Sequence, residues 1–193
     1  MKKKLVERLM HERVSGLKGT DGYFIRGDFD DILSGVLLDY TPSGVYIYDF
    51  KFPLFDFSGP NLTFSDRIKG RPFIEKEEMS EQSLVDYILA SPEGATAFAK
   101  DSSMSVRAFA GYLVESNKCV RAPHARLIFA SALILLAQES QAAEILRELP
   151  PKLHRTDVPH CNSLSERLRQ GPEHARALLR QFKDENLKAF ALS

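Results

Sequence analysis

The sequence predicts an α+β protein: an N-terminal antiparallel sheet of three to four strands, packed with a C-terminal multi-helix bundle. Strand-like runs follow one another up to residue 74 without helices between them, which favours an antiparallel meander over βαβ units. From residue 75 onward, apolar residues recur at helical spacing. The 193 residues are enough for a buried core, and we expect 1–74 and 75–193 to pack as one compact unit.

In the first part, Lys4–Leu17 has apolar residues at helical spacing and predicts a short amphipathic helix. Three strands are predicted at YFIRGDF, DILSGVLLDY and GVYIYDFKFPLF, which are rich in the β-branched and aromatic residues that suit a pleated surface. A fourth short strand is predicted at LTFSDRI.

The second part predicts helices only. One helix begins at Ser91-Pro92, because serine caps a helix and proline fits its first turn. KLHRTDVPHCN predicts a loop, after which Ser163 or Ser165 caps the next helix. The other helices are predicted at EEMSEQSLVDYILA, SMSVRAFAGYLVES, APHARLIFASALILLAQ, SQAAEILREL and EHARALLRQFKDENLKAFAL.

Two of the helix pairs are alike. FASALILLAQESQAAEILREL and SERLRQGPEHARALLRQF each contain a helix, a short break and then A-x-x-I-L or A-x-x-L-L. The pattern resembles the helix–turn–helix pairs of tetratricopeptide-like solenoids, over about 55 residues. Ordinary packing of helical hairpins explains it equally well.

Charge and cysteine content narrow the function classes. The chain carries 26 Lys/Arg and 26 Asp/Glu, so there is no global attraction to nucleic acid or to an anionic membrane. Two cysteines in a chain of this length favour a reducing compartment, and we expect a cytoplasmic location. The longest apolar run, Leu127–Ala137, is too short to span a bilayer. Acidic residues interrupt the basic start, so no signal peptide is expected.

The strand pair around Thr41-Pro42-Ser43-Gly44-Val45 holds the sharpest candidate site. A three-residue loop, with Thr41 paired to Val45, places Asp39, Asp49 and Lys51 on one face, because side chains alternate along strands. A two-residue loop instead places Asp39 on the aromatic face, away from Asp49 and Lys51.

With the three-residue loop, Asp39 and Asp49 are placed to bind one Mg²⁺, which prefers oxygen ligands. The metal would activate water for attack on a phosphodiester, and Lys51 would stabilise the developing charge. Asp39 with Asp49-Phe50-Lys51 resembles the core motif of PD-(D/E)xK nucleases, which implies a nucleic-acid substrate. The alternative is that the aromatic face packs on the helices, while Asp49 and Lys51 form a solvated face and bind no cofactor.

A second resemblance covers Leu33–Ile68, which is similar to a segment of an uncharacterised bacterial protein family of unknown function. It implies a bacterial origin and no mechanism. The leading hypothesis is therefore a non-catalytic interaction protein, for example an immunity-like accessory protein, which binds a protein partner or a second copy through an aromatic sheet edge or a groove between helices. Its candidate binding residues are the arginines Arg67, Arg169, Arg176 and Arg180.

Two cysteines and two histidines offer a further hypothesis. Cys119, His124, His160 and Cys161 are residue types that bind zinc. Adjacent His160 and Cys161 suit one tetrahedral site poorly, because neighbouring side chains diverge. A core cysteine and loop histidines are the favoured interpretation.

Overall fold

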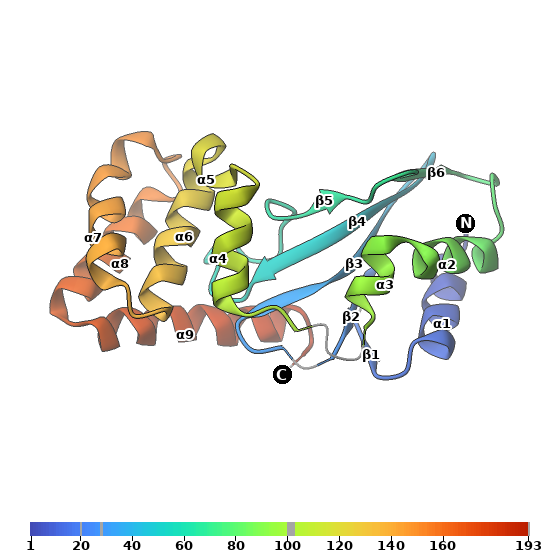
Figure 1. Ribbon diagram of the computed structural model, residues 1–193, viewed down its shortest axis with the longest axis horizontal. Helices are drawn as coiled ribbons and strands as arrows, with labels where there is room; N and C mark the ends of the chain where they lie inside the picture. The colour runs from blue at the N-terminus through green and yellow to red at the C-terminus, as the bar shows by residue number, and fades with distance from the viewer. Residues whose placement is uncertain (20, 28, 100–102, 193) are drawn as a thin grey trace. The chain divides into compact units, whose positions relative to one another are not determined.

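The computed structural model describes residues 1–19, 21–27, 29–99 and 103–192. It is an α+β protein whose contacts divide the chain into two compact units. The sheet unit comprises residues 1–52, 64–103 and 190–192, and the helical unit comprises residues 53–63 and 104–189. The change from strand to helix near residue 75 is not a unit boundary, because α2 (Glu81–Ala90) and α3 (Pro92–Ala97) pack on the sheet (Figure 1).

Among the described residues, the sheet has six strands in the order β1-β2-β3-β4-β5, and β6 also pairs with β4. The sequence predicts three or four of them. It misses β1 and β6, which are only two and three residues long and too short to show alternation. The strands are β1 (Leu17–Lys18), β2 (Tyr23–Arg26), β3 (Ile32–Thr41), β4 (Gly44–Pro53), β5 (Asp66–Arg67) and β6 (Phe73–Glu75).

The β3–β4 hairpin has a two-residue loop. Strand β3 ends at Thr41 and β4 begins at Gly44, so only Pro42 and Ser43 lie between them. The expected three-residue loop is therefore wrong. The Thr41 side chain closes the turn, because its hydroxyl accepts a hydrogen bond from the Gly44 amide and donates one to the Gly44 carbonyl, each at 3.1 Å.

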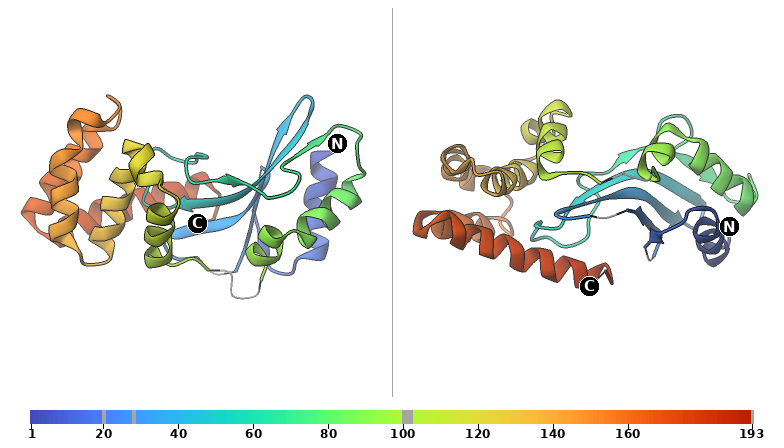
Figure 2. Two further views of the ribbon diagram at one scale, coloured as in Figure 1. Left: turned by 45° about the horizontal axis from the view of Figure 1, so that its top comes forward. Right: turned by 60° about the horizontal axis from the view of Figure 1, so that its bottom comes forward.

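The aliphatic face of the sheet forms the core of this unit. Val36, Leu38, Val45 and Ile47 are buried against α1 (Lys3–Arg13), α2 and α3, which lie on the same side of the sheet (Figure 2). One interpretation of the sequence has the aromatic face packed on the helices, but α1, α2 and α3 pack on the aliphatic face instead. The aliphatic face is covered by residues of α1, α2 and α3 and by the C-cap of α3, which include Val6, Met10, Leu84, Val85, Ile88, Ala97 and Phe98.

The aromatic rings lie on the opposite face. At one end of it Tyr23 contacts Phe50 edge-on, with 5.2 Å between ring centroids. Phe190 packs against Tyr23 and Phe52 at 5.1 Å each, so residues near the C-terminus complete the core of the sheet unit.

The helical unit is built from successive helices with short connections (Figure 1). The loop expected at 152–162 is shorter than predicted, because α8 already begins at Val158, with Pro159 in its first turn. Ser163 and Ser165, the predicted caps, therefore lie inside the helix. The short helix α5 was not predicted. The elements are α4 (Val106–Glu115), α5 (Lys118–Arg121), α6 (Pro123–Leu135), α7 (Glu139–Glu148), the 3₁₀ turn η1 (Pro150–Lys152), α8 (Val158–Gln170) and α9 (Pro172–Ala189).

Serine caps begin three of the described helices, and the sequence predicts the one at Ser91. Ser80 accepts a hydrogen bond from the Ser83 amide, Ser91 from Gly94 and Ser105 from Ala108. Among the helices that the structure describes, none combines the length and the apolar character needed to cross a bilayer.

Candidate functional site

The structure does not bring Asp39 together with Asp49 and Lys51. Tyr23 pairs with Leu37, so Asp39, two residues further along β3, shares a face with Tyr23. The Tyr23 ring contacts Phe50, which places Phe50 on that face as well. Asp49 and Lys51 alternate with Phe50 and therefore lie on the other face. The two carboxylates expected to share a magnesium ion are on opposite sides of the sheet.

Asp49 instead belongs to a different group of charges. Its carboxylate accepts a hydrogen bond from Lys51 at 2.6 Å, and it lies directly opposite Asp66 on β5. The pKa of Asp49 is raised, first by burial and also by the negative charges of Asp66 and Glu93, against the lowering effect of Lys51. In the residues that the structure describes, no group of three His, Cys, Asp or Glu side chains has a geometry that would hold a metal ion.

Arg67 lies over an aromatic cluster on the face away from α1, α2 and α3. Its guanidinium is 4.5 Å from the ring centroid of Tyr46, an arrangement that favours a cation–π interaction. The Tyr46 ring also contacts Phe73 at 4.5 Å and Tyr48 at 6.3 Å. Cross-strand pairing explains the cluster, because Tyr46 pairs with Phe73 and Tyr48 pairs with Arg67.

This aromatic platform, defined as Tyr46, Tyr48, Arg67 and Phe73, is accessible to solvent. The three rings are half-buried and Arg67 is exposed. Within the described parts of the chain, no carboxylate forms an ion pair with Arg67. The platform therefore presents apolar rings and one available guanidinium on the same surface.

The three helical arginines do not form a joint site. Arg169 on α8 pairs with Glu166 on the same helix, and Arg180 on α9 is exposed. Arg176 connects α9 to its neighbours: its Nε donates to the Ile134 carbonyl at 3.2 Å, and its guanidinium pairs with Glu139. Of the three, Arg176 is the one that holds helices together.

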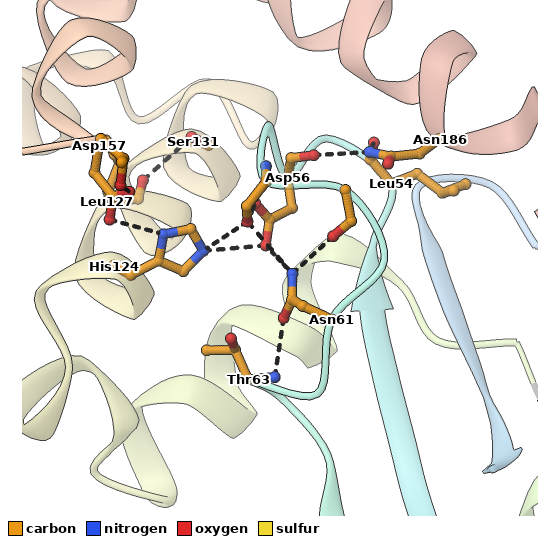
Figure 3. A network of polar contacts seen from close by, with 12 residues as sticks. Leu54, Asp56, Asn61, Thr63, His124, Leu127, Ser131, Asp157 and Asn186 are labelled. Atoms are coloured by element: carbon orange, nitrogen blue, oxygen red, sulfur yellow. Dashed lines mark hydrogen bonds and ion pairs between the residues drawn. The ribbon is translucent and has the colours of Figure 1, made fainter. Parts of the chain in front are cut away.

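A polar network in the helical unit was not expected from the sequence. Asp56, which has no exposed surface, accepts hydrogen bonds from the amide and hydroxyl of Ser58 and from Asn61 (Figure 3). Asn186 from α9 donates to the Leu54 and Asp56 carbonyls at 2.7 Å each. These bonds supply hydrogen-bond partners to polar groups of a loop that lies outside any helix or strand ladder.

His124 lies between two carboxylates of this network (Figure 3). Its Nε2 is 3.1 Å from Asp56 and its Nδ1 is 3.2 Å from Asp157. Burial lowers the pKa of His124, but hydrogen bonds and charges from Asp56 and Asp157 outweigh burial, so the pKa is raised overall. When the ring is protonated, both nitrogens donate to these carboxylates, and His124 joins the 53–63 segment, α6 and the start of α8.

This geometry suits a structural clamp better than an acid–base site. The Ser58 hydroxyl is 3.4 Å from His124 Nε2, but it donates to Asp56, and Asp56 is nearer to the same nitrogen. Both ring nitrogens of His124 already face carboxylates, so neither is placed to take a proton from serine. The signal in the sequence was Asp56 itself, a lone acid within the apolar run Pro53–Phe57.

The cysteines and histidines are not gathered for zinc. Cys161 is buried in α8, and its thiol pKa is raised to about 11 by burial. His160 is helical and stacks on Phe57 with 4.0 Å between ring centroids. The loop histidine expected at position 160 is thus a helix residue whose ring packs on an aromatic neighbour.

Comparison with known proteins leaves the site to be judged from its geometry. No protein-family model matches the chain, and no curated protein or solved structure matches it either.

Proposed function

We propose that this chain is a cytoplasmic bacterial interaction protein that binds a protein partner through the aromatic platform of its sheet unit. The observation that carries the proposal is the position of Arg67 over Tyr46, with Tyr48 and Phe73 beside them. Tyrosine and arginine are enriched where protein interfaces concentrate their binding energy. A guanidinium already held over a ring loses little freedom when it binds a carboxylate.

The charge of the sheet unit favours protein over nucleic acid. Residues 1–52, 64–103 and 190–192 carry 13 Lys/Arg and 16 Asp/Glu, so the unit as a whole repels a phosphate backbone. The occupant that fits is a loop of a protein partner with a carboxylate for Arg67 beside an apolar side chain for the rings. The proposal requires no cofactor. The nuclease hypothesis requires Asp39 to lie near Asp49, so it is not part of the proposed function.

Affinity capture from bacterial lysate, followed by reconstitution with the purified partner, tests the proposal. Wild type is compared with Arg67→Glu and Tyr46→Ala. Arg169→Glu is the control, because it makes the same charge change at an exposed arginine of the helical unit. We expect a complex whose dissociation constant rises by about tenfold or more in the two platform variants and stays unchanged in the control.

Two results would count against the proposal. Equal binding by wild type, Arg67→Glu and Tyr46→Ala would show that the platform is not the binding surface. Concentration-dependent self-association that Arg67→Glu abolishes, measured by light scattering, would identify a second copy of the chain as the occupant.

A further inference from the structure

The helical unit contains a groove that the proposed function does not use. It has a volume of about 460 Å³ and is bounded by α5, α6 and α7, of which α6 packs against both of the others (Figure 1). Its apolar lining comes from Cys119, Val120, Phe129 and Ile145, and its polar lining from Arg126, Gln141, Glu144 and Glu148.

Val120 is the clearest sign that the groove is incomplete. Its side chain is 84% exposed, and Val114 at the end of the neighbouring α4 is 55% exposed. Asn117 adopts a left-handed conformation with φ 56°, which turns the chain from α4 into α5. Val120 both lines the groove and is exposed, so a molecule that filled the groove would bury this apolar side chain.

The groove wall on α7 presents one apolar residue among polar ones. Gln141, Glu144, Ile145 and Glu148 follow the spacing i, i+3, i+4 and i+7, so they form one face of α7. An apolar strip is thus bordered by acids. Grooves of this kind bind an amphipathic helix, whose apolar residues at i, i+3 or i+4, and i+7 fill the floor.

The charged residues at the rim of the groove indicate which charge a bound helix would carry. Glu148 is paired with Arg126 at 3.0 Å, whereas Glu144 is exposed and has no ion-pair partner among the residues described here. One negative charge on the groove rim is therefore available to a cation. Burial raises the pKa of the Cys119 thiol to about 11, so this cysteine contributes apolar surface rather than a thiolate.

We propose that the α5–α6–α7 groove binds an amphipathic helix of a protein partner that places apolar residues on Val120, Phe129 and Ile145 and a lysine or arginine on Glu144. The site is independent of the aromatic platform, and the chain would then join two proteins.

Fluorescence anisotropy with two labelled peptides of about 18 residues tests this proposal on the full chain. Both peptides carry leucines at i, i+3, i+4 and i+7. One has lysines flanking the leucines and the other has glutamates. The helical unit carries 13 Lys/Arg and 10 Asp/Glu, so its overall charge would favour the glutamate peptide. A preference for the lysine peptide therefore reports the groove itself.

We expect wild type to bind the lysine peptide about tenfold more tightly than the glutamate peptide. Glu144→Lys should abolish or reverse this preference, and Val120→Asp should weaken both peptides by about tenfold. Both positions are exposed, so the variants should remain folded, which circular dichroism checks. Glu185→Lys, an equal charge change at an exposed site on α9, should leave binding unchanged.

Three results would overturn the proposal. One is no binding of the lysine peptide at about 100 μM. Another is a loss of affinity in Glu185→Lys as large as that in Glu144→Lys. The third is a dimer in solution that Val120→Asp dissociates, which would assign the groove to a second copy.

Discussion

The imidazole Nε2 of His124 lies 3.1 Å from Oδ2 of Asp56, a carboxylate with no exposed surface. The other ring nitrogen, Nδ1, faces the half-buried carboxylate of Asp157. Only the protonated ring can donate a hydrogen bond to both carboxylates at once. The segment that follows β4 is therefore held by a titratable bond.

The first prediction concerns pH. The pKa of His124 is raised in the folded protein, so the stability it contributes is fully present below the unfolded value near 6.5 and is lost as pH rises through the folded value. His124→Gln should lower the free energy of unfolding by about 2–4 kcal/mol near pH 6, and by less near pH 9. Urea unfolding followed by circular dichroism measures this difference.

His11→Gln, at an exposed position on α1, provides the matched control and should change stability little at any pH. A His124→Gln effect that is the same from pH 5.5 to pH 9 would mean that the imidazole does not act through its charge.

The second prediction concerns Asn186. Its side-chain amide donates to the Leu54 and Asp56 carbonyls inside the helical unit, and its side chain is buried. Asn186→Ala should cost about 2 kcal/mol, because two buried carbonyls lose their donor, and Asn186→Asp should cost more, because it places a carboxylate against them. Gln181→Ala on an exposed position of α9 should have almost no effect. Thermal unfolding of the three variants measures these differences. Equal melting temperatures for Asn186→Ala and Gln181→Ala would show that the two hydrogen bonds of Asn186 do not stabilise the helical unit.

The third prediction concerns magnesium. Asp39 and Asp49 lie on opposite faces of the sheet, so millimolar Mg²⁺ should leave the melting temperature unchanged in wild type and in Asp49→Ala. A rise in melting temperature with Mg²⁺ that disappears in Asp49→Ala would restore the nuclease hypothesis.

The fourth prediction compares two glycines. A Cβ added at Gly35 in β3 would overlap the Phe24 carbonyl and approach the Phe50 ring at 3.0 Å, so Gly35→Ala should destabilise the sheet unit by about 2 kcal/mol or more. At Gly111 in α4, no atom beyond the neighbouring backbone of its own helix lies within 4 Å of the added Cβ. Gly111→Ala should therefore stabilise the helix by about 0.5–1 kcal/mol. Similar melting temperatures for the two variants would contradict this packing.

Local patterns in the sequence predict much of the fold, and contacts between distant residues explain what they miss. The alternation in Ile32–Thr41 and Gly44–Pro53 identifies the two long strands, and Ser91-Pro92 marks the start of α3. The predicted site at Asp39, Asp49 and Lys51 failed because of one loop residue. A loop of two rather than three residues moves Asp39 to the other face of the sheet. Arg67 was a candidate from the sequence, but its aromatic partners come from cross-strand pairing.

The path of the chain between the two units has a consequence for how the protein is made. The chain leaves the sheet unit after residue 52, returns at residue 64, leaves again after residue 103 and returns at residue 190. During synthesis on the ribosome, the 53–63 segment cannot form its polar network until His124, Asp157 and Asn186 have been made. Tyr23 and Phe52 likewise lack their ring contacts until Phe190 has been made. Neither unit can complete its packing until the last of its segments has been synthesised, and no single cut in the chain separates one unit from the other.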